Sequence, residues 1–186
     1  MEILNKIELK LQVNQIIEKI KEGAIFIHPT DTIYGIGCNA LNQKSVEKIR
    51  QLKERPTQPL SIWIPSIDWI KYNCKIDKKA EKWIEELPGP YTLILKLKHE
   101  NAIAKNVSQK TIGVRIPDHW FSEIIKEANI PIITTSANKA GKPFMEDKED
   151  LDQEIEKGID FMIYEGKKQA RPSKIINVET ENIKKR

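Results

Sequence analysis

Cysteine is scarce in this chain of 186 residues, which contains only Cys38 and Cys74. The two do not form a Cys-x-x-Cys pair, so the sequence predicts neither a disulfide framework nor a structural zinc site. Long apolar runs are also lacking, because stretches such as 130–133 fall far short of the ~20 residues that a membrane-spanning helix requires. The length fits one compact domain, and we expect a single domain over residues 1–186.

The chain also lacks the apolar segment of a secretory signal, since charged residues interrupt its first ten positions. We therefore expect a cytoplasmic protein without a membrane span. Charge of one sign is only slightly in excess: 31 basic and 27 acidic residues give +4, which is too mild to establish nucleic-acid binding. The distribution is more informative, because basic residues gather in two places: Lys44, Lys48, Arg50, Lys53 and Arg55, and then Lys167, Lys168, Arg171 and Lys174.

Familiar nucleotide-binding and catalytic motifs are missing. The chain has no phosphate-loop pattern Gly-x-x-x-x-Gly-Lys-Ser/Thr and no nucleophile-elbow pattern Gly-x-Ser-x-Gly. Segment 35–40 formally fits a dinucleotide pattern, but Pro29 and a polar segment separate it from the preceding strand, so we interpret this segment as a tight turn. The histidines are scattered, which favours surface or edge positions over a metal centre: they are His28, His99 and His119.

Hydrophobic periodicity switches repeatedly between helical and strand spacing. Helices are expected from Val13 to Gly23, from Asn42 to just before Pro56, after caps at Asp77 and Asp118, and around 150–157. Strands are expected over 24–28, 60–64, 91–97, 111–116, 131–135, 161–164 and 173–178. This alternation predicts the α/β class, a single domain in which helices pack on one twisted mixed sheet.

Polar residues follow several of these strands. Within 111–116, Thr111, Gly113 and Arg115 alternate with apolar residues, so one face belongs to the core and the other is open to a ligand. Lys53 and Arg55 stand at a helix exit, where a solvated terminus favoured by the helix dipole is the alternative explanation. Segment 136–138 follows another strand, and an ordinary polar turn is its alternative explanation.

Five blocks, in this order, resemble the YrdC family: Pro29-Thr30-Asp31-Thr32-Ile33-Tyr34-Gly35; Lys53-Glu54-Arg55-Pro56 with Pro59-Leu60; Pro88-Gly89-Pro90-Tyr91-Thr92; Val114-Arg115-Ile116-Pro117-Asp118-His119; and Thr135-Ser136-Ala137-Asn138. The resemblance covers residues 23–178. It implies a YrdC-like fold with a concave basic cavity. It also implies L-threonylcarbamoyladenylate synthase activity, in which L-threonine, bicarbonate or carbon dioxide, and ATP give threonylcarbamoyl-AMP and pyrophosphate. A separate transferase would then use this intermediate to modify tRNA.

The resemblance also implies which residues line the site, with no residue assigned as acid or base and no metal bound by the protein. Lys53 and Arg55 would stabilise charge on the phosphates, and Mg²⁺ is expected to accompany ATP. Arg115 would pair with the threonine carboxylate through two hydrogen bonds. The implied ATP contacts are Lys53, Arg55, Thr57, Thr111, Ser136, Asn138 and Glu146. The implied L-threonine contacts are Thr30, Arg115, Ser136 and Ser173.

The sequence departs from the family pattern at several positions. Glu54 lies inside the Lys-x-Arg pair, where a small or basic residue is more usual, and we expect it to face solvent. Only two residues separate Pro56 from Pro59, one fewer than is common, which bears on the assignment of Thr57. Trp63 stands near a position where some members have histidine. Segment 144–146 replaces a Ser-Pro-Thr-like run, so Glu146 is expected to contribute only its backbone.

Other functions remain open at this stage. A carbamoyl-transfer domain of the hydrogenase-maturation type shares the fold, but its acylphosphatase and zinc-finger modules do not fit in 186 residues. The main alternative is a non-catalytic RNA-binding module of the same fold, which binds double-stranded RNA through phosphate contacts or associates with the ribosome. A direct contact with tRNA or double-stranded RNA is left open in either case. A nucleotide-binding relative that has lost synthesis is a third.

Overall fold

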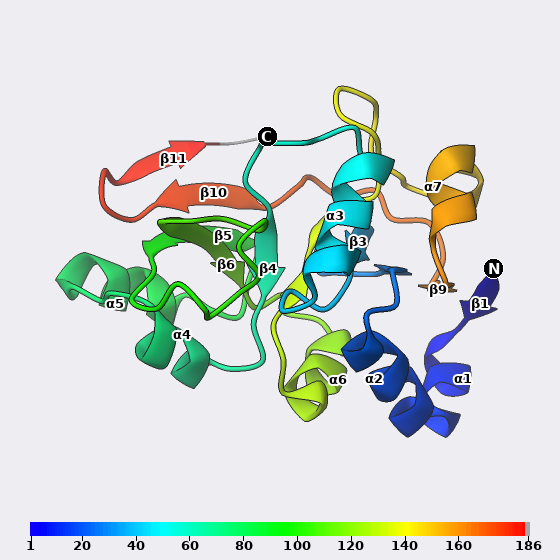
Figure 1. Ribbon diagram of the computed structural model, residues 1–186, viewed down its shortest axis with the longest axis horizontal. Helices are drawn as coiled ribbons and strands as arrows, with labels where there is room; N and C mark the ends of the chain where they lie inside the picture. Colours follow the sequence, from blue (N-terminus) through cyan, green and yellow to red (C-terminus); the bar gives the residue numbers. More distant parts are fainter. Residues whose placement is uncertain (185–186) are drawn as a thin grey trace.

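The computed structural model describes residues 1–184, in which helices and strands interleave (Figure 1). The helices are α1 (Lys6–Leu11), α2 (Val13–Glu22), α3 (Gln43–Leu52), α4 (Ile67–Asn73), α5 (Lys78–Glu85), α6 (Phe121–Ala128) and α7 (Gln153–Gly158), with a 3₁₀ turn η1 (Lys148–Asp150). The strands are β1 (Glu2–Leu4), β2 (Phe26–His28), β3 (Gly35–Gly37), β4 (Ser61–Trp63), β5 (Tyr91–Lys96), β6 (Thr111–Arg115), β7 (Ile132–Ile133), β8 (Thr135–Ser136), β9 (Phe161–Ile163), β10 (Lys174–Asn177) and β11 (Asn182–Lys184).

The strands form two mixed sheets rather than the one expected. The five-stranded sheet has the order β1-β9-β2-β3-β8, and the six-stranded sheet has the order β11-β10-β5-β6-β4-β7. Parallel and antiparallel pairs occur in both, for example β2 with β9 and β2 with β3 in the first sheet. The α/β class with mixed sheets is therefore confirmed, while the division into two sheets was not visible in the periodicity.

Helices cover both sides of the sheets. One apolar cluster joins α3, α4, α5 and α7 to both sheets, with residues such as Ile27 from β2 and Ile62 from β4. A second cluster joins α1, α2 and α6 to the opposite side, around Phe26 and Trp63. Figure 1 shows α1, α2 and α6 gathered together away from the other helices. The five-stranded sheet thus has helices on both faces, whereas β5 and β6 of the six-stranded sheet have helices on one face and carry polar residues such as Thr92 and Arg115 on the other.

Several predicted helix boundaries are confirmed. Gly23 ends α2 with φ 106°, Asn42 caps α3 by accepting from two backbone N–H groups, and Asp77 caps α5 in the same way. The cap predicted at Asp118 is wrong, because α6 begins at Phe121 after Trp120. The backbone N–H of Asp118 instead donates to Asp31 Oδ2 at 3.2 Å. The short elements β1, α1, α4 and β11 were not predicted.

Two further expectations are corrected. Residues 35–37 form β3 rather than a tight turn, and His28 is fully buried rather than at the surface or an edge. The two findings are linked, since a Cβ at Gly35 would lie 2.7 Å from His28 Cε1 and one at Gly37 would lie 3.2 Å from His28 Nε2. The glycines therefore make room for the imidazole. Among the helices of residues 1–184, none has the length and apolar character to cross a membrane.

The expected strand over 131–135 is divided between the sheets at Thr134. β7 pairs with β4 in the six-stranded sheet, whereas β8 pairs with β3 in the five-stranded sheet. The N–H of Thr134 donates to Ser61 O at 2.9 Å at the point of transfer. This crossover brings Ser136 and the loop after it to the seam between the sheets.

Candidate functional site

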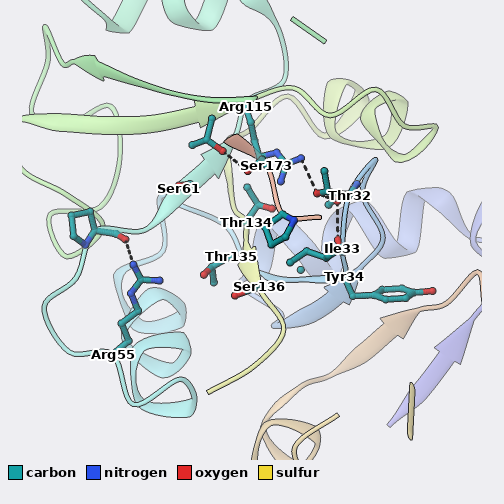
Figure 2. A pocket seen from close by; sticks show the side chains of 15 residues that line it. Thr32, Ile33, Tyr34, Arg55, Ser61, Arg115, Thr134, Thr135, Ser136 and Ser173 are labelled. Carbon is teal, nitrogen blue, oxygen red and sulfur yellow. Dashed lines mark hydrogen bonds between the residues drawn. The ribbon is translucent and has the colours of Figure 1, made fainter. Parts of the chain in front are cut away.

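A cavity lies at this seam, and Figure 2 shows side chains from both sheets and three connecting segments around it. We call it the central cavity. Most of its polar lining consists of hydroxyl and guanidinium groups, which donate hydrogen bonds to anionic ligands. Its lining residues are Thr30, Thr32, Ile33, Tyr34, Gly35, Arg55, Pro59, Ser61, Thr92, Arg115, Thr134, Thr135, Ser136, Pro172 and Ser173.

The floor of the cavity is the polar face of the six-stranded sheet. Ser61 of β4 pairs with Gly113 of β6, and Trp63 pairs with Arg115. A Cβ at Gly113 would lie 2.8 Å from Ser61 Oγ and 3.1 Å from Thr92 Cγ2, so glycine keeps this part of the floor flat. The prediction that Arg115 lies opposite the apolar face is confirmed, since Ile112 and Val114 point into the core.

The loop after β2 forms one wall. Thr30 Oγ1 lies 2.9 Å from Thr32 Oγ1 and donates to Ile33 O at 2.8 Å, which closes the loop on itself. Asp31 accepts from Arg115 Nη2 at 2.6 Å, and Arg115 Nη2 also lies 3.4 Å from Thr32 Oγ1. Thr30, Thr32 and Arg115 are buried. These contacts fix the guanidinium against the loop, and Figure 2 shows the one between Arg115 and Thr32.

Lys53 and Arg55 approach the cavity from the exit of α3. Lys53 is the C-cap residue of α3 and is only 2% exposed. Its Nζ donates to the backbone oxygens of Ser136 and Asn138, the latter at 2.6 Å. Arg55 is half-buried at the rim, where its Nη2 donates to Pro59 O at 3.1 Å. Burial, and secondarily the charge of Arg50, lowers the pKa of Arg55 from its ordinary value.

Another part of the wall is built by the segment that enters β10. Ser173 is buried, and its Oγ lies 2.9 Å from Thr92 Oγ1 of β5. Thr30, Arg115, Ser136 and Ser173, the residues expected to hold L-threonine, therefore line one cavity together with Arg55. The ligand assignment of these residues stays a prediction.

The remaining expected ATP residues lie outside the central cavity. Asn138 and Glu146 line a neighbouring cleft with Lys139, Lys142, Phe144 and Lys167, which we call the outer cleft. Thr57 is exposed on another cleft, with Arg50 and Ser108. Thr111 begins β6, about 13 Å along the strand from Arg115 at ~3.3 Å per residue. Glu54 faces solvent and pairs with Lys139 at 3.0 Å, as expected.

A strap between β9 and β10 borders the cavity beside Tyr34. The Tyr34 hydroxyl donates to Gly166 O at 2.6 Å and accepts from the N–H of Glu165 at 3.0 Å. Burial alone would raise the pKa of Glu165, but hydrogen bonds from His119, Lys168 and Trp120 outweigh it and lower this pKa to about 2. Glu165 is therefore a carboxylate near neutral pH, and it holds the strap in place.

Sequence reasoning missed several residues of the cavity. Pro59 and Thr92 stand in the quoted family blocks but were given no role, so the signal for them was present. Ser61 and Thr134 gave no signal, because their place in the cavity depends on strand pairing and on the crossover.

The arrangement favours binding of anions and of an amino acid over acid–base catalysis. Two guanidinium groups, a buried ammonium group and the hydroxyl groups of eight serine and threonine residues face or adjoin one space. Within residues 1–184, no cluster of three or more His, Cys, Asp and Glu side chains is arranged to hold a metal ion. Such groups are suited to charge stabilisation and to the orientation of a ligand.

An α/β domain of two mixed sheets, with a cationic cavity at their seam, defines the YrdC-like class of proteins. The family model for Sua5, YciO and YrdC proteins, described as "Telomere recombination", matches residues 18–185. The chain therefore belongs to this family.

Relatives in sequence agree with that assignment. A protein of Methanocaldococcus jannaschii named "Putative threonylcarbamoyl-AMP synthase" is 40% identical over 184 residues, which cover 97% of this chain and 86% of that protein. The threonylcarbamoyl-AMP synthase of Bacillus subtilis is 35% identical over 138 residues, 71% of this chain and 40% of that protein. The uncharacterized protein YciO of Escherichia coli is also similar, at 27% identity over 89% of this chain and 83% of that protein.

Solved structures share the fold. Sua5 of P. abyssi in complex with L-threonine superposes with a TM-score of 0.83 at 28% identity, covering 95% of this chain and 53% of that one. The chain thus spans about half the length of that protein. E. coli YciO superposes with a TM-score of 0.80 at 23% identity, covering 95% of this chain and 88% of that one.

Proposed function

We propose that this protein is an L-threonylcarbamoyladenylate synthase, a nucleotidyltransferase that makes threonylcarbamoyl-AMP and pyrophosphate from L-threonine, bicarbonate or carbon dioxide, and ATP. The observation that carries the proposal is that Thr30, Arg115 and Ser173 share one cavity with Arg55 and Ser136. One end therefore offers a guanidinium and hydroxyls to an amino acid, and the other offers a guanidinium to phosphate oxygens. Relatives named threonylcarbamoyl-AMP synthases, and Sua5 complexed with L-threonine, support this substrate pair.

The proposed chemistry relies on positioning. The threonine amine captures carbon dioxide as a carbamate, and a carbamate oxygen attacks the α-phosphorus of ATP while pyrophosphate leaves. The negative charge that moves onto the pyrophosphate is stabilised by Arg55 and by Mg²⁺ bound with the nucleotide. Because burial disfavours the charged form of Arg55, an approaching phosphate gains a strong partner there.

Lys53 has a part in this proposal that differs from a direct phosphate contact. Its ammonium holds the backbone of Ser136 and Asn138, so it shapes the Ser-x-Asn loop and adds positive charge beneath it. Asn138 and Glu146 then extend the nucleotide site into the outer cleft. We assign the reaction to the cytoplasm, and its product to a downstream transferase that modifies tRNA.

The test is to incubate the purified protein with ATP, Mg²⁺, bicarbonate and L-threonine and to analyse the products by mass spectrometry. The proposal requires a threonine-dependent adenylate together with an equal amount of pyrophosphate. Omission of bicarbonate from carbon dioxide-depleted buffer serves as the control. Release of pyrophosphate without the adenylate, or no turnover at all, would contradict the proposal.

The RNA-binding alternative rests on a different observation, the basic strap beside the cavity. Lys167, Lys168, Arg171 and Lys174 flank Pro172 and Ser173, and Lys168 Nζ lies 5.9 Å from the Tyr34 ring. Affinity for double-stranded RNA that falls steeply with salt, without adenylate formation, would favour this function.

A further inference from the structure

Asp31 makes contacts that go beyond an ordinary ion pair. Its Oδ1 accepts from Arg115 Nη2 at 2.6 Å, and its Oδ2 accepts from the backbone N–H of Asp118 at 3.2 Å. Both oxygens are therefore bound, one to the side chain of Arg115 and one to the backbone three residues after it. The carboxylate joins the loop after β2 to the exit of β6 at two points.

The pair is well shielded from water. The side chains of Arg115 and Asp31 are only 8% and 10% exposed, whereas the other ion pairs between lysine or arginine and a carboxylate in residues 1–184 each include a side chain at least 24% exposed. Removing one partner of a shielded ion pair costs much more stability than removing one partner of an exposed pair, because the remaining charge is left buried. The arginine side chain also has several rotatable bonds, and fixing it before a ligand arrives removes part of the entropy cost of binding.

Asp31 also changes the charge at this end of the cavity. It offsets the positive charge of Arg115, while Arg55 at the rim has no acidic partner among the ion pairs of residues 1–184. A guanidinium whose charge is partly neutralised by a carboxylate attracts a phosphate group less strongly. It is better suited to a zwitterion, which brings a positive amine next to its carboxylate. The end of the cavity at Arg115 therefore carries less net positive charge than the end at Arg55.

We propose that Asp31 is a positioning residue that acts through Arg115 and adapts this end of the cavity to the carboxylate of an α-amino acid. The proposal rests on the function proposed above. It assigns Asp31 no proton transfer and no direct contact with the nucleotide. Asp31 therefore affects the binding of the amino acid substrate and not that of the nucleotide.

The test is a double-mutant cycle with Asp31→Asn, Arg115→Ala and the double variant. The affinity for L-threonine is measured by calorimetry, and kcat/KM for L-threonine by pyrophosphate release. We expect Asp31→Asn alone to weaken both at least about fivefold, and to add no more than about twofold in the Arg115→Ala background. The affinity for a non-hydrolysable ATP analogue should stay within about twofold of wild type. Asp68→Asn is the matched control, because that side chain is 84% exposed.

The outcomes are distinct. A smaller effect of Asp31→Asn, a larger further loss in the Arg115→Ala background, or an equal loss of affinity for the ATP analogue would overturn the positioning role while leaving the synthase function intact. A wild-type protein that binds no L-threonine would instead overturn the proposed function itself. Should Asp31→Asn not fold by circular dichroism, the same cycle is run with Asp31→Glu, which keeps the charge but displaces both oxygens, under the same criteria.

Discussion

Lys53 Nζ donates to the backbone oxygen of Asn138 at 2.6 Å and also to that of Ser136, so the exit of α3 is tied to the loop that follows β8. The lysine belongs to one sequence block of the family and the loop to another. A residue that the sequence suggests as a phosphate ligand therefore has a structural role as well.

Lys53→Ala should lower both stability and turnover. Loss of the ammonium leaves two backbone oxygens without this donor, which should cost about 1–3 kcal/mol of unfolding free energy. The displaced loop should also slow pyrophosphate release at least about tenfold, or ~1.4 kcal/mol of barrier. Urea denaturation and a pyrophosphate assay measure the two effects. Lys48→Ala, on the exposed face of α3, is the control, and equal behaviour of both variants would refute the role of Lys53.

Arg55→Ala should act on the nucleotide alone. We expect kcat/KM for ATP to fall at least about tenfold, with the KM for L-threonine within about twofold of wild type, because Arg55 lies at the rim and away from Arg115 and Thr32. Steady-state kinetics with each substrate varied in turn provide the measurement. Glu54→Gln tests the neighbouring position and should be close to wild type, since that carboxylate is exposed.

Arg115→Ala should affect the use of L-threonine and leave the use of ATP nearly unchanged. Removing the guanidinium should raise the KM for L-threonine at least about tenfold and leave the KM for ATP within about twofold. The same kinetic assay applies, with Lys126→Ala on the exposed face of α6 as the control. Equal increases in both KM values would contradict the assignment of Arg115 to the carboxylate.

His28 should make the folded state sensitive to acid. Complete burial lowers its pKa from 6.5 to about 3, so the native protein keeps the imidazole neutral where the unfolded chain binds a proton. Stability is then fully present above pH 6.5 and is lost as the pH falls toward 3, at up to about 1.4 kcal/mol per pH unit from this group.

The measurement is the unfolding free energy of the wild type and of His28→Gln between pH 7 and pH 4. The variant should show a shallower slope, because it lacks the proton that the unfolded wild-type chain binds at His28. His99→Gln removes an exposed histidine and should keep the wild-type slope. Parallel curves for wild type and His28→Gln would rule out this contribution.

Much of the secondary structure could be predicted from local sequence. The end of α2 at Gly23 and the caps at Asn42 and Asp77 depend on neighbouring residues only, and their prediction was confirmed. Asp118 shows where such reasoning fails. It has the residue type of a cap, yet its backbone is bound by Asp31, and α6 starts later. A distant contact therefore overrides the local preference.

The same division holds for the candidate site. The sequence by itself determined which segments are polar at strand ends, which face of β6 carries Arg115, and the order of blocks that marks the family. Only the tertiary structure decided that the strand over 131–135 changes sheets at Thr134, that Lys53 holds a loop, and that Asp31 pairs with Arg115. The contacts of Lys53 and of Asp31 join residues 83 to 85 positions apart, and periodicity within a segment contains no information about which distant segment it will meet.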